Sequence, residues 1–250
     1  MLSEYEQKRY SRQIMLDEIG LQGQEMLSNS KVLVVGTGGL ASPVLYYLAA
    51  AGVGNIEVID YDTVELSNFN RQIIHTEKYM GKPKIESVIN QIKEFNSSID
   101  IKGHKIALTS ENAGTYISSY DVVIDCVDNL GTRYIVNDTC CRKGIPLVEA
   151  GVSGFEGYVM TILPGRSPCF RCIYPDNRLP KKTDVKPGVL GVTAGIAGTL
   201  QAAEAIKIIL GMGEPLFSGI LTFNALSMKF EKIGAARVAG CLSCGHLSKQ

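Results

Sequence analysis

The sequence predicts an α/β fold built on a Rossmann-like, doubly wound mixed sheet. A buried-strand run, Val32 to Val35, ends at a glycine turn, and an apolar helical segment from Leu40 to Ala51 follows. A second strand, Ile56 to Ile59, then leads directly to Asp60. This βαβ unit predicts parallel strands, whereas the glycine-punctuated segment that begins at Gly151 predicts antiparallel ones. We therefore expect a parallel half of the sheet followed by an antiparallel half.

The length and charge of the chain restrict its class. Its 250 residues are enough for a full core, and we expect a single domain over residues 1–250. Lys plus Arg and Asp plus Glu number 25 each, so no global field attracts nucleic acid or a membrane surface. The polar N-terminus argues against a signal peptide, and no apolar run reaches the roughly 18 residues of a spanning helix. We expect a cytoplasmic protein.

Further elements follow from periodicity and from turn residues. Residues 1–29 are expected to form an amphipathic helical arm broken at Gly20 and Gly23, residues 30–150 a nucleotide-binding half, and residues 151–250 a second half. A long loop is expected at about 175–192, because this stretch is rich in proline and has no periodicity. The remaining helices are expected at 83–95, 112–117, 132–143 and 193–210, and the remaining strands at 100–106, 122–125, 146–149 and 219–224, the last of which would complete the sheet.

The glycine turn contains Gly36, Gly38 and Gly39. Such a turn brings backbone N–H groups to an anion at a helix N-terminus, where the helix dipole also favours negative charge. Asp60 follows about 20 residues later, where a Rossmann unit hydrogen-bonds a ribose hydroxyl. The third glycine of the usual fingerprint is replaced by Ala41. The turn predicts a nucleotide site, and a tight turn without a ligand is the alternative.

Two positively charged side chains that could contact phosphate follow in the sequence, Arg71 and Lys84. Residues 61–72 form a loop dense in hydrogen-bonding groups that includes Arg71, whose planar guanidinium suits phosphate oxygens. Pro83 favours a helix start, which places Lys84 in the first turn, where a cation opposes the helix dipole. This placement favours an anion facing Lys84, and a solvated lysine is the alternative.

Asp128 follows the buried strand at 122–125. Ligands bind outside the carboxyl ends of strands in open α/β sheets, where the glycine turn, Asp60 and Asp128 would gather. Because Mg²⁺ takes few carboxylates and shares phosphate oxygens, Asp128 is a candidate magnesium ligand. A capping role at the helix that begins near Leu130 is the alternative, and both roles are compatible.

The cysteines form two C-x-x-C pairs, Cys169 with Cys172 and Cys241 with Cys244. Two such pairs predict a closed, tetrahedral and structural zinc site. A redox pair is the alternative, but thioredoxin-like pairs precede a helix, and we expect none after Cys172. Packed thiols are expected at Cys140 and Cys141, on a predicted helix.

Six motifs in this order together resemble the MoeB/ThiF adenylyltransferases of the E1-like HesA/MoeB/ThiF family, bacterial relatives of the ubiquitin-activating enzymes. They are GTGGLASPVLYYLAAAGVG, DYDTVELSNFNRQ, GKPKIES, DCVDN, the paired C-x-x-C motifs and GTLQAAEAIK. The resemblance covers nearly the whole chain and implies a ThiF fold with structural zinc. It implies an enzyme that uses ATP and Mg²⁺ to adenylate the C-terminal glycine of a small ubiquitin-like sulfur-carrier protein, similar to ThiS or MoaD.

The resemblance also assigns roles to residues. It implies that Arg71 and Lys84 act on the phosphates and Asp128 on the metal and nucleotide. Arg12, in RYSRQ, resembles an arginine that family members place in the ATP site of a partner subunit, which implies a homodimer. Residues 151–250 would hold the carrier and the zinc. The implied nucleotide-contacting residues are Gly36, Gly38, Gly39, Asp60, Asp62, Ser67, Asn68, Asn70, Arg71, Gln72, Lys84, Asp128 and Asn129.

One departure bears on sulfur transfer. Thiamine-pathway relatives carry a cysteine in the crossover loop where this chain has Asp184, which cannot form a thioester or persulfide. We expect a separate sulfur donor, a cysteine desulfurase or a rhodanese-like protein, and the thiamine and molybdopterin pathways both remain open. Three different functions also stay open: adenylation of a peptide or another carboxylate in natural-product assembly, an inactive scaffold that binds a ubiquitin-like tail, and an NAD(P)-binding oxidoreductase.

Overall fold

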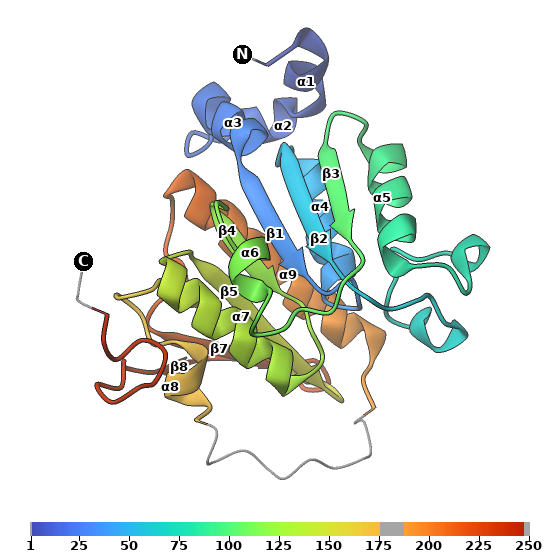
Figure 1. Cartoon of the computed structure of the whole chain (residues 1–250). Helices are drawn as coiled ribbons and strands as arrows, with labels where there is room; N and C mark the ends of the chain where they lie inside the picture. Colours follow the sequence, from blue (N-terminus) through green and yellow to red (C-terminus); the bar gives the residue numbers. More distant parts are fainter. Residues whose placement is uncertain (1, 176–187, 248–250) are drawn as a thin grey trace.

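A single sheet of eight strands organises the chain, for which a computed structural model describes residues 2–175 and 188–247 (Figure 1). The strand order is β3-β2-β1-β4-β5-β6-β7-β8. Strands β1 to β5 pair in parallel, and β5 to β8 pair antiparallel, which confirms the predicted mixed sheet. The strands are β1 (Lys31–Val35), β2 (Asn55–Ile59), β3 (Asp100–His104), β4 (Val122–Asp125), β5 (Leu147–Ser153), β6 (Glu156–Ile162), β7 (Gly219–Asn224) and β8 (Lys229–Gly234).

Helices cover both faces of this sheet. In Figure 1, α6 and α7 lie in front of it and α4 and α9 behind it. The α-helices are α1 (Glu4–Arg9), α2 (Ser11–Ile14), α3 (Gly20–Asn29), α4 (Ala41–Ala51), α5 (Lys84–Phe95), α6 (Ala113–Tyr116), α7 (Leu130–Lys143), α8 (Phe170–Ile173) and α9 (Gly191–Leu210), and the 3₁₀ turns are η1 (Leu66–Asn68) and η2 (Glu77–Tyr79).

Alternation along β1 divides the core into two layers. Val32 and Val34 pack in a cluster with α4, α5 and α9, whereas Leu33 and Val35 pack in a second cluster with α6 and α7. Successive side chains of a strand point to opposite faces, so a continuous apolar run is required where helices cover both. The run VLVV meets this requirement, and β1 lies in the interior of the sheet, between β2 and β4.

Two expectations about elements were wrong. The sheet does not end at β7, because β8 adds an edge strand. The arm is not broken at Gly23, which lies inside α3, although a break does precede Gly20. The short helix α8, for which Cys169 is the N-cap, was not predicted; it contains Cys172 and ends one residue later, at Ile173.

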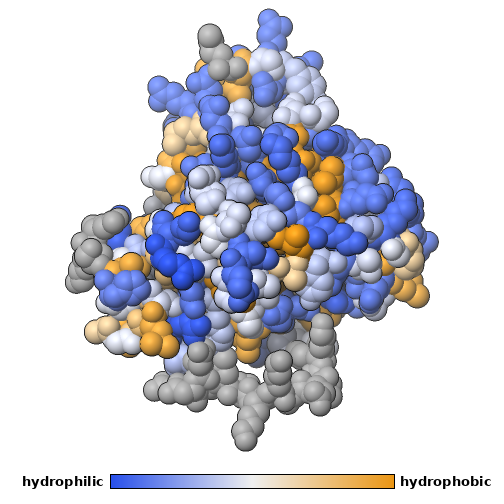
Figure 2. All heavy atoms as spheres, in the orientation of Figure 1, coloured by the Kyte–Doolittle hydropathy of each residue, from blue (hydrophilic) through white to orange (hydrophobic). Residues whose placement is uncertain are grey.

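The helix α9 has the length and apolar composition of a membrane span, contrary to the expectation that no segment would reach that length. It packs in the core instead, with residues such as Ala197, Ala202 and Ala205 buried behind the sheet. On the face drawn in Figure 2, hydrophilic residues predominate and apolar residues form small separate groups. Most of the predicted loop at 175–192, including Asp184, lies outside the described residues.

Candidate nucleotide site and cysteine cluster

The glycine turn lies where β1 ends, between the ends of β2 and β4. The sheet order reverses its direction of growth between β1 and β4, which is the usual ligand position in open α/β sheets. Gly36 has φ +89°, and a Cβ there would lie 2.8 Å from the carbonyl oxygen of Cys126. Glycine is therefore required at this position by both conformation and space.

Unpaired backbone donors follow the turn. Within residues 2–175 and 188–247, the N–H groups of Gly38, Gly39 and Leu40 donate to no acceptor. These groups begin α4, and a helix N-terminus carries partial positive charge. The arrangement can hold an anion, as the sequence predicted for Gly38 and Gly39.

Asp60 shapes the turn from the end of β2. Its Oδ2 accepts hydrogen bonds from the backbone N–H of Thr37 at 2.8 Å and from the Thr37 hydroxyl at 2.7 Å. Its Oδ1 accepts from the N–H of Asp62 at 2.8 Å. Asp60 therefore orders the glycine turn, a role additional to the ribose contact that the sequence suggested.

Lys84 reaches the same edge of the sheet from the start of α5. Its side chain is only 7% exposed, and Nζ lies 2.9 Å from Oδ2 of Asp62, which is 47% exposed. The backbone N–H of Lys84 also donates to the carbonyl oxygen of Asp62, at 3.0 Å. Lys84 is thus paired rather than solvated, and its partner borders the open side of the site.

Arg71 and Gln72 pack over the start of α4. A Cβ on Gly39 would lie 3.3 Å from Cγ of Arg71, and one on Gly38 would lie 3.7 Å from Nε2 of Gln72. The buried Oε1 of Gln72 has no hydrogen-bond partner among the described residues. A buried amide oxygen without a partner is costly, and a ligand or water donor beside the glycine turn would satisfy it.

The neighbouring polar residues of this loop bind one another. Nη1 of Arg71 donates to the Ser67 carbonyl and to Oδ1 of Asn70, both at 2.9 Å. Asn68 is buried, and its Oδ1 accepts from the N–H of Glu65 at 3.1 Å, which caps η1. The structure therefore brings Ser67, Asn68 and Asn70 to the loop that carries Arg71.

Asp128 and Asn129 form the β4 side of the site. Asn129 is the N-cap of α7 and accepts from the N–H of Thr132 at 2.9 Å. The capping role therefore belongs to Asn129. Asp128 is exposed and follows Val127, whose backbone nitrogen is 3.2 Å from the Cβ position of Gly36. Asp128 thus lies on the segment that contacts the glycine turn.

A buried ionic cluster beneath this segment was not predicted. Arg133 of α7 forms an ion pair with Glu149 and donates to the carbonyl oxygen of Val127 at 2.7 Å. Asp125 is fully buried and accepts from the N–H of Val127 at 3.0 Å. Burial raises the pKa of Asp125 and of Glu149, and Arg133 opposes both shifts. The sequence does contain one indication of this cluster: an acidic residue, Asp125 or Glu149, ends each of two buried strand runs, and a buried carboxylate needs a partner.

Arg12 is not brought to this site within one chain. Its neighbour Gln13 donates to the carbonyl of Ala51, the last residue of α4, at 3.0 Å, whereas the glycine turn precedes the first residue. The 11 residues of α4 span about 16 Å, so α2 lies at the opposite end of this helix. Arg12 is exposed and forms no hydrogen bond or ion pair with any described residue.

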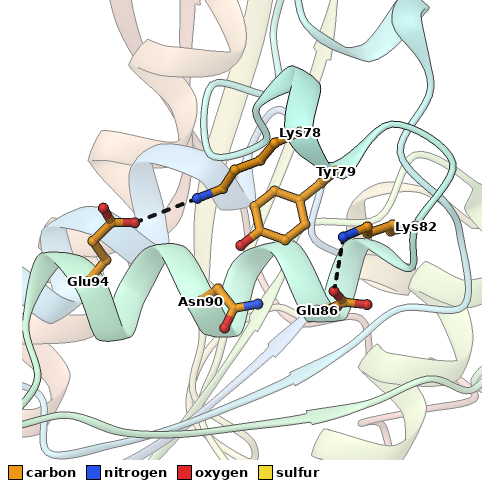
Figure 3. A pocket seen from close by; sticks show the side chains of 6 residues that line it. All are labelled: Lys78, Tyr79, Lys82, Glu86, Asn90 and Glu94. Atoms are coloured by element: carbon orange, nitrogen blue, oxygen red, sulfur yellow. Dashed lines mark ion pairs between the residues drawn. The ribbon is translucent and has the colours of Figure 1, made fainter.

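The outer face of α5 carries an open groove of about 500 Å³ (Figure 3). Nζ of Lys78 and of Lys82 lie 5.1 and 5.4 Å from the centroid of the Tyr79 ring. Each lysine also pairs with a glutamate of α5, at 3.9 Å for Glu94 and 3.7 Å for Glu86. The groove is lined by these compensated surface charges, and Lys84 is not among its lining residues.

The four predicted zinc ligands do come together. The sulfur atoms of Cys169, Cys172, Cys241 and Cys244 all lie within 4.8 Å of one another. The Cys169–Cys241 and Cys172–Cys244 distances are 3.5 and 3.4 Å. Thiolates around a tetrahedral Zn²⁺ with Zn–S bonds of about 2.3 Å would be about 3.8 Å apart. The cluster fits a zinc site by donor type, number and spacing.

Known proteins are similar to this chain in sequence and in fold. MOCS3 of Aedes aegypti, named adenylyltransferase and sulfurtransferase, is 45% identical over 97% of this chain, and MOCS3 of Sus scrofa is 43% identical over 98%. The chain spans about half the length of these relatives, 56% and 54%. A crystal structure of E. coli MccB with ATP has a TM-score of 0.85 at 25% identity, covering 98% of this chain and 77% of that chain.

A second structure supports the same relationship. The microcin C7 biosynthetic enzyme MccB with N-formylated MccA also has a TM-score of 0.85 at 25% identity, covering 98% of this chain and 77% of the other. Residues 10–243 match the ThiF family over nearly the whole length. The chain belongs to the ThiF family.

Proposed function

We propose that the chain is an ATP-dependent adenylyltransferase that activates the C-terminal glycine carboxylate of a small ubiquitin-like sulfur-carrier protein as an acyl-adenylate. The observation that carries this proposal is the set of N–H groups of Gly38, Gly39 and Leu40 that are unpaired within the described part of the chain; Arg71 packs beside them, and Lys84 pairs with Asp62 at the same edge of the sheet. Backbone donors and cations at a helix N-terminus suit a triphosphate. The MOCS3 name and the ATP complex of MccB point the same way.

ATP would bind across the carboxyl ends of β1, β2 and β4. Its phosphates would lie on the start of α4, with Arg71 and Lys84 supplying positive charge. Without nucleotide, Lys84 pairs with Asp62. When a phosphate group binds, Lys84 would leave Asp62 or be shared with it, because a phosphate with two negative charges attracts the ammonium group more strongly than a single carboxylate does. Asp60 and the loop at 67–72 would hold the ribose and complete the nucleotide contacts.

The reaction needs positioning more than proton transfer. An oxygen of the carrier's terminal carboxylate attacks the α-phosphorus, and the bond from that phosphorus to the bridging oxygen of the β-phosphate breaks. The bridging oxygen keeps the electron pair and leaves as pyrophosphate. A C-terminal carboxylate is already ionised at pH 7, so no general base is required. Arg71 and Lys84 would stabilise the charge that develops on the phosphate oxygens.

Asp128 would hold Mg²⁺ directly or through water. A carboxylate at the edge of a phosphate site is a typical magnesium ligand, and Asp128 is exposed beside the glycine turn. The ion would neutralise phosphate charge. Zn²⁺ would be held by the four cysteines and would staple the segments at 169–172 and 241–244 together.

A homodimer would complete the site. Because one chain leaves Arg12 at the far end of α4, a second copy is the natural source of that cation. Sulfur would come from a separate protein, a cysteine desulfurase or a rhodanese-like donor, since Asp184 replaces the loop cysteine of thiamine-pathway relatives. The carrier in this proposal belongs to a thiamine, molybdopterin or other sulfur pathway.

A second candidate substrate is a peptide. It is favoured by the complex of MccB with N-formylated MccA, whose fold this chain shares over 98% of its length. The chemistry at the phosphates would be unchanged, and only the carboxylate donor would differ. Hydride transfer with NAD(P) is a weaker candidate, because it assigns no role to Arg71, Lys84 or the cysteine cluster.

Exchange of radiolabelled pyrophosphate into ATP tests the proposal. The purified protein is assayed with Mg²⁺ and a panel of carrier proteins that end in Gly-Gly. Each carrier is also tested without its last glycine as the matched control. Exchange that depends on an intact Gly-Gly tail supports the proposal. Exchange with a peptide alone supports the second candidate, and absence of exchange with every carboxylate contradicts adenylation.

A further inference from the structure

His75 lies behind the glycine turn and bridges it to α5. The imidazole is buried, with 4% of the residue exposed. Its Nε2 lies 3.0 Å from the carbonyl oxygen of Thr37, and its Nδ1 lies 3.0 Å from the hydroxyl oxygen of Ser87. Both ring nitrogens therefore have one partner each, on two different elements of the candidate site.

The two hydrogen-bond partners of His75 determine which nitrogen of the imidazole carries the proton. A carbonyl oxygen only accepts hydrogen bonds, so Nε2 carries the proton and donates to Thr37. Nδ1 then accepts from the hydroxyl of Ser87. Burial lowers the pKa of His75 to about 4, and the positive charge of Lys84 acts in the same direction. The ring is thus a neutral, oriented hydrogen-bond bridge at pH 7.

The bridge fixes one peptide of the glycine turn. The N–H of Thr37 donates to Asp60 at 2.8 Å, and its carbonyl accepts from His75 at 3.0 Å. In a trans peptide the carbonyl of Thr37 and the N–H of Gly38 point in opposite directions. Holding the carbonyl toward His75 therefore aims the N–H of Gly38 away from the core. Without this restraint the glycines would sample many orientations.

The other end of the bridge lies on the helix that carries Lys84. Ser87 is three residues after Lys84 in α5, so the two side chains share one face of the helix. His75 thereby ties the unpaired N–H groups of Gly38 and Gly39 to the helix turn that presents the ammonium group.

We propose that His75 is a positioning residue that presets the distance and orientation between the phosphate-facing N–H groups of the glycine turn and Lys84. This inference rests on the proposed role of the turn in binding the phosphates of ATP. His75 touches neither the nucleotide nor the carrier in this proposal, so its effect passes through Thr37 and Ser87.

Two substitutions at His75 distinguish the effect of its hydrogen bonds from the effect of the volume that the ring fills. His75→Leu fills the space and removes both hydrogen bonds, whereas His75→Gln keeps an N–H donor for Thr37. The matched control is His104→Leu, since the ring of His104 pairs with Glu57 of β2 and takes no part in the bridge. We expect His75→Leu to weaken ATP affinity in calorimetry by about tenfold and His75→Gln by less than about threefold. Unchanged ATP affinity in His75→Leu would overturn the inference.

Nuclear magnetic resonance without nucleotide makes the inference independent of ATP binding. In the wild-type protein, the imidazole nitrogen signals of His75 should show the Nε2-protonated tautomer. In Ser87→Ala and His75→Leu, the amide signals of Gly38 and Gly39 should shift or broaden. The opposite tautomer, or unchanged glycine signals, would overturn the inference. Failure of wild-type protein to bind ATP would instead contradict the proposed function, while the glycine signals still report the bridge.

Discussion

The guanidinium of Arg133 donates to the carbonyl oxygen of Val127 at 2.7 Å, one residue before Asp128. The N–H of Val127 donates to Asp125 at 3.0 Å. A buried acid and a buried cation thus hold both polar groups of one residue's backbone. Both backbone polar groups of Thr37 are also held, its N–H by the carboxylate of Asp60 and its carbonyl by the neutral ring of His75. The two loops that face the candidate nucleotide site are therefore restrained from within the core.

Removal of Arg133 should strongly destabilise the fold. Arg133→Met leaves Glu149 and Asp125 buried without a cation, and losing one partner of a buried pair costs about 3–5 kcal/mol. The double variant Arg133→Met/Glu149→Gln removes one carboxylate as well, and should be more stable than Arg133→Met by about 1–3 kcal/mol. Urea denaturation measures both differences. A double variant that is no more stable than Arg133→Met would contradict this account of the cluster.

Loss of the cysteine cluster should lower thermal stability. The cluster joins two distant segments, and metal binding free energy becomes folding free energy. The wild-type protein should contain about one zinc per chain, and Cys169→Ser should lose it with a fall in melting temperature of roughly 10 °C or more. Cys140→Ala, a buried cysteine outside the cluster, is the control and should retain zinc. Equal melting temperatures for wild type and Cys169→Ser, with no zinc in either, would rule out the staple.

The sequence was sufficient for elements that carry a strong pattern. The apolar runs of β1 and β4, the glycine turn and the two cysteine pairs each have a local signature. The strand β8 has none, because all six residues of KFEKIG are exposed at the sheet edge and alternation gives no buried face. Gly23 lies inside α3, where a Cβ would lie 3.1 Å from Ile19 and 3.5 Å from Leu210. Close packing, and not a helix break, therefore explains the glycine at this position.

The candidate site was predictable only where its residues stand in a local sequence motif. Asp60, Arg71 and Lys84 stand in recognisable motifs. Two ion pairs, Lys84 with Asp62 and Arg133 with Glu149, depend instead on where strands and helices meet in the fold. The periodicity of the sequence does not predict these contacts. His75 follows buried Ile74 without any pattern of its own.

Lys84 and Lys82 make a matched pair for testing the phosphate site. Lys84 is 7% exposed and pairs with Asp62 at the site, whereas Lys82 is 51% exposed and pairs with Glu86 on the outer face of α5. Lys84→Ala should reduce pyrophosphate exchange by at least about 100-fold, and Lys82→Ala should leave it within about twofold. Circular dichroism should show both variants folded, since Asp62 is partly exposed and can be solvated. Equal exchange rates in the two variants would remove Lys84 from the mechanism.

Protonation of His75 should make the fold less stable in acid. Its pKa falls from 6.5 to about 4 in the folded protein, so the unfolded chain binds this proton first as the pH falls. The associated stability is present above pH 6.5 and is lost between pH 6.5 and about 4, with a loss on the order of 3 kcal/mol. Urea denaturation across this range should therefore show a shallower pH dependence in His75→Leu than in wild type. Parallel curves would contradict the buried neutral ring.

Arg12 provides a test of whether two chains share a site. In the proposed dimer, Arg12→Ala removes a cation from the partner's site, and Lys84→Ala inactivates its own. When the two inactive variants are mixed and allowed to exchange subunits, half of the dimers are mixed, and each mixed dimer has one site with both cations. Pyrophosphate exchange should therefore recover to about a quarter of the wild-type rate. The double variant Arg12→Ala/Lys84→Ala, mixed with wild type, is the control, because its mixed dimers contain no complete site. If the two single variants remain inactive after verified subunit exchange, Arg12 does not act across a dimer, and its exposed position at the far end of α4 needs another explanation.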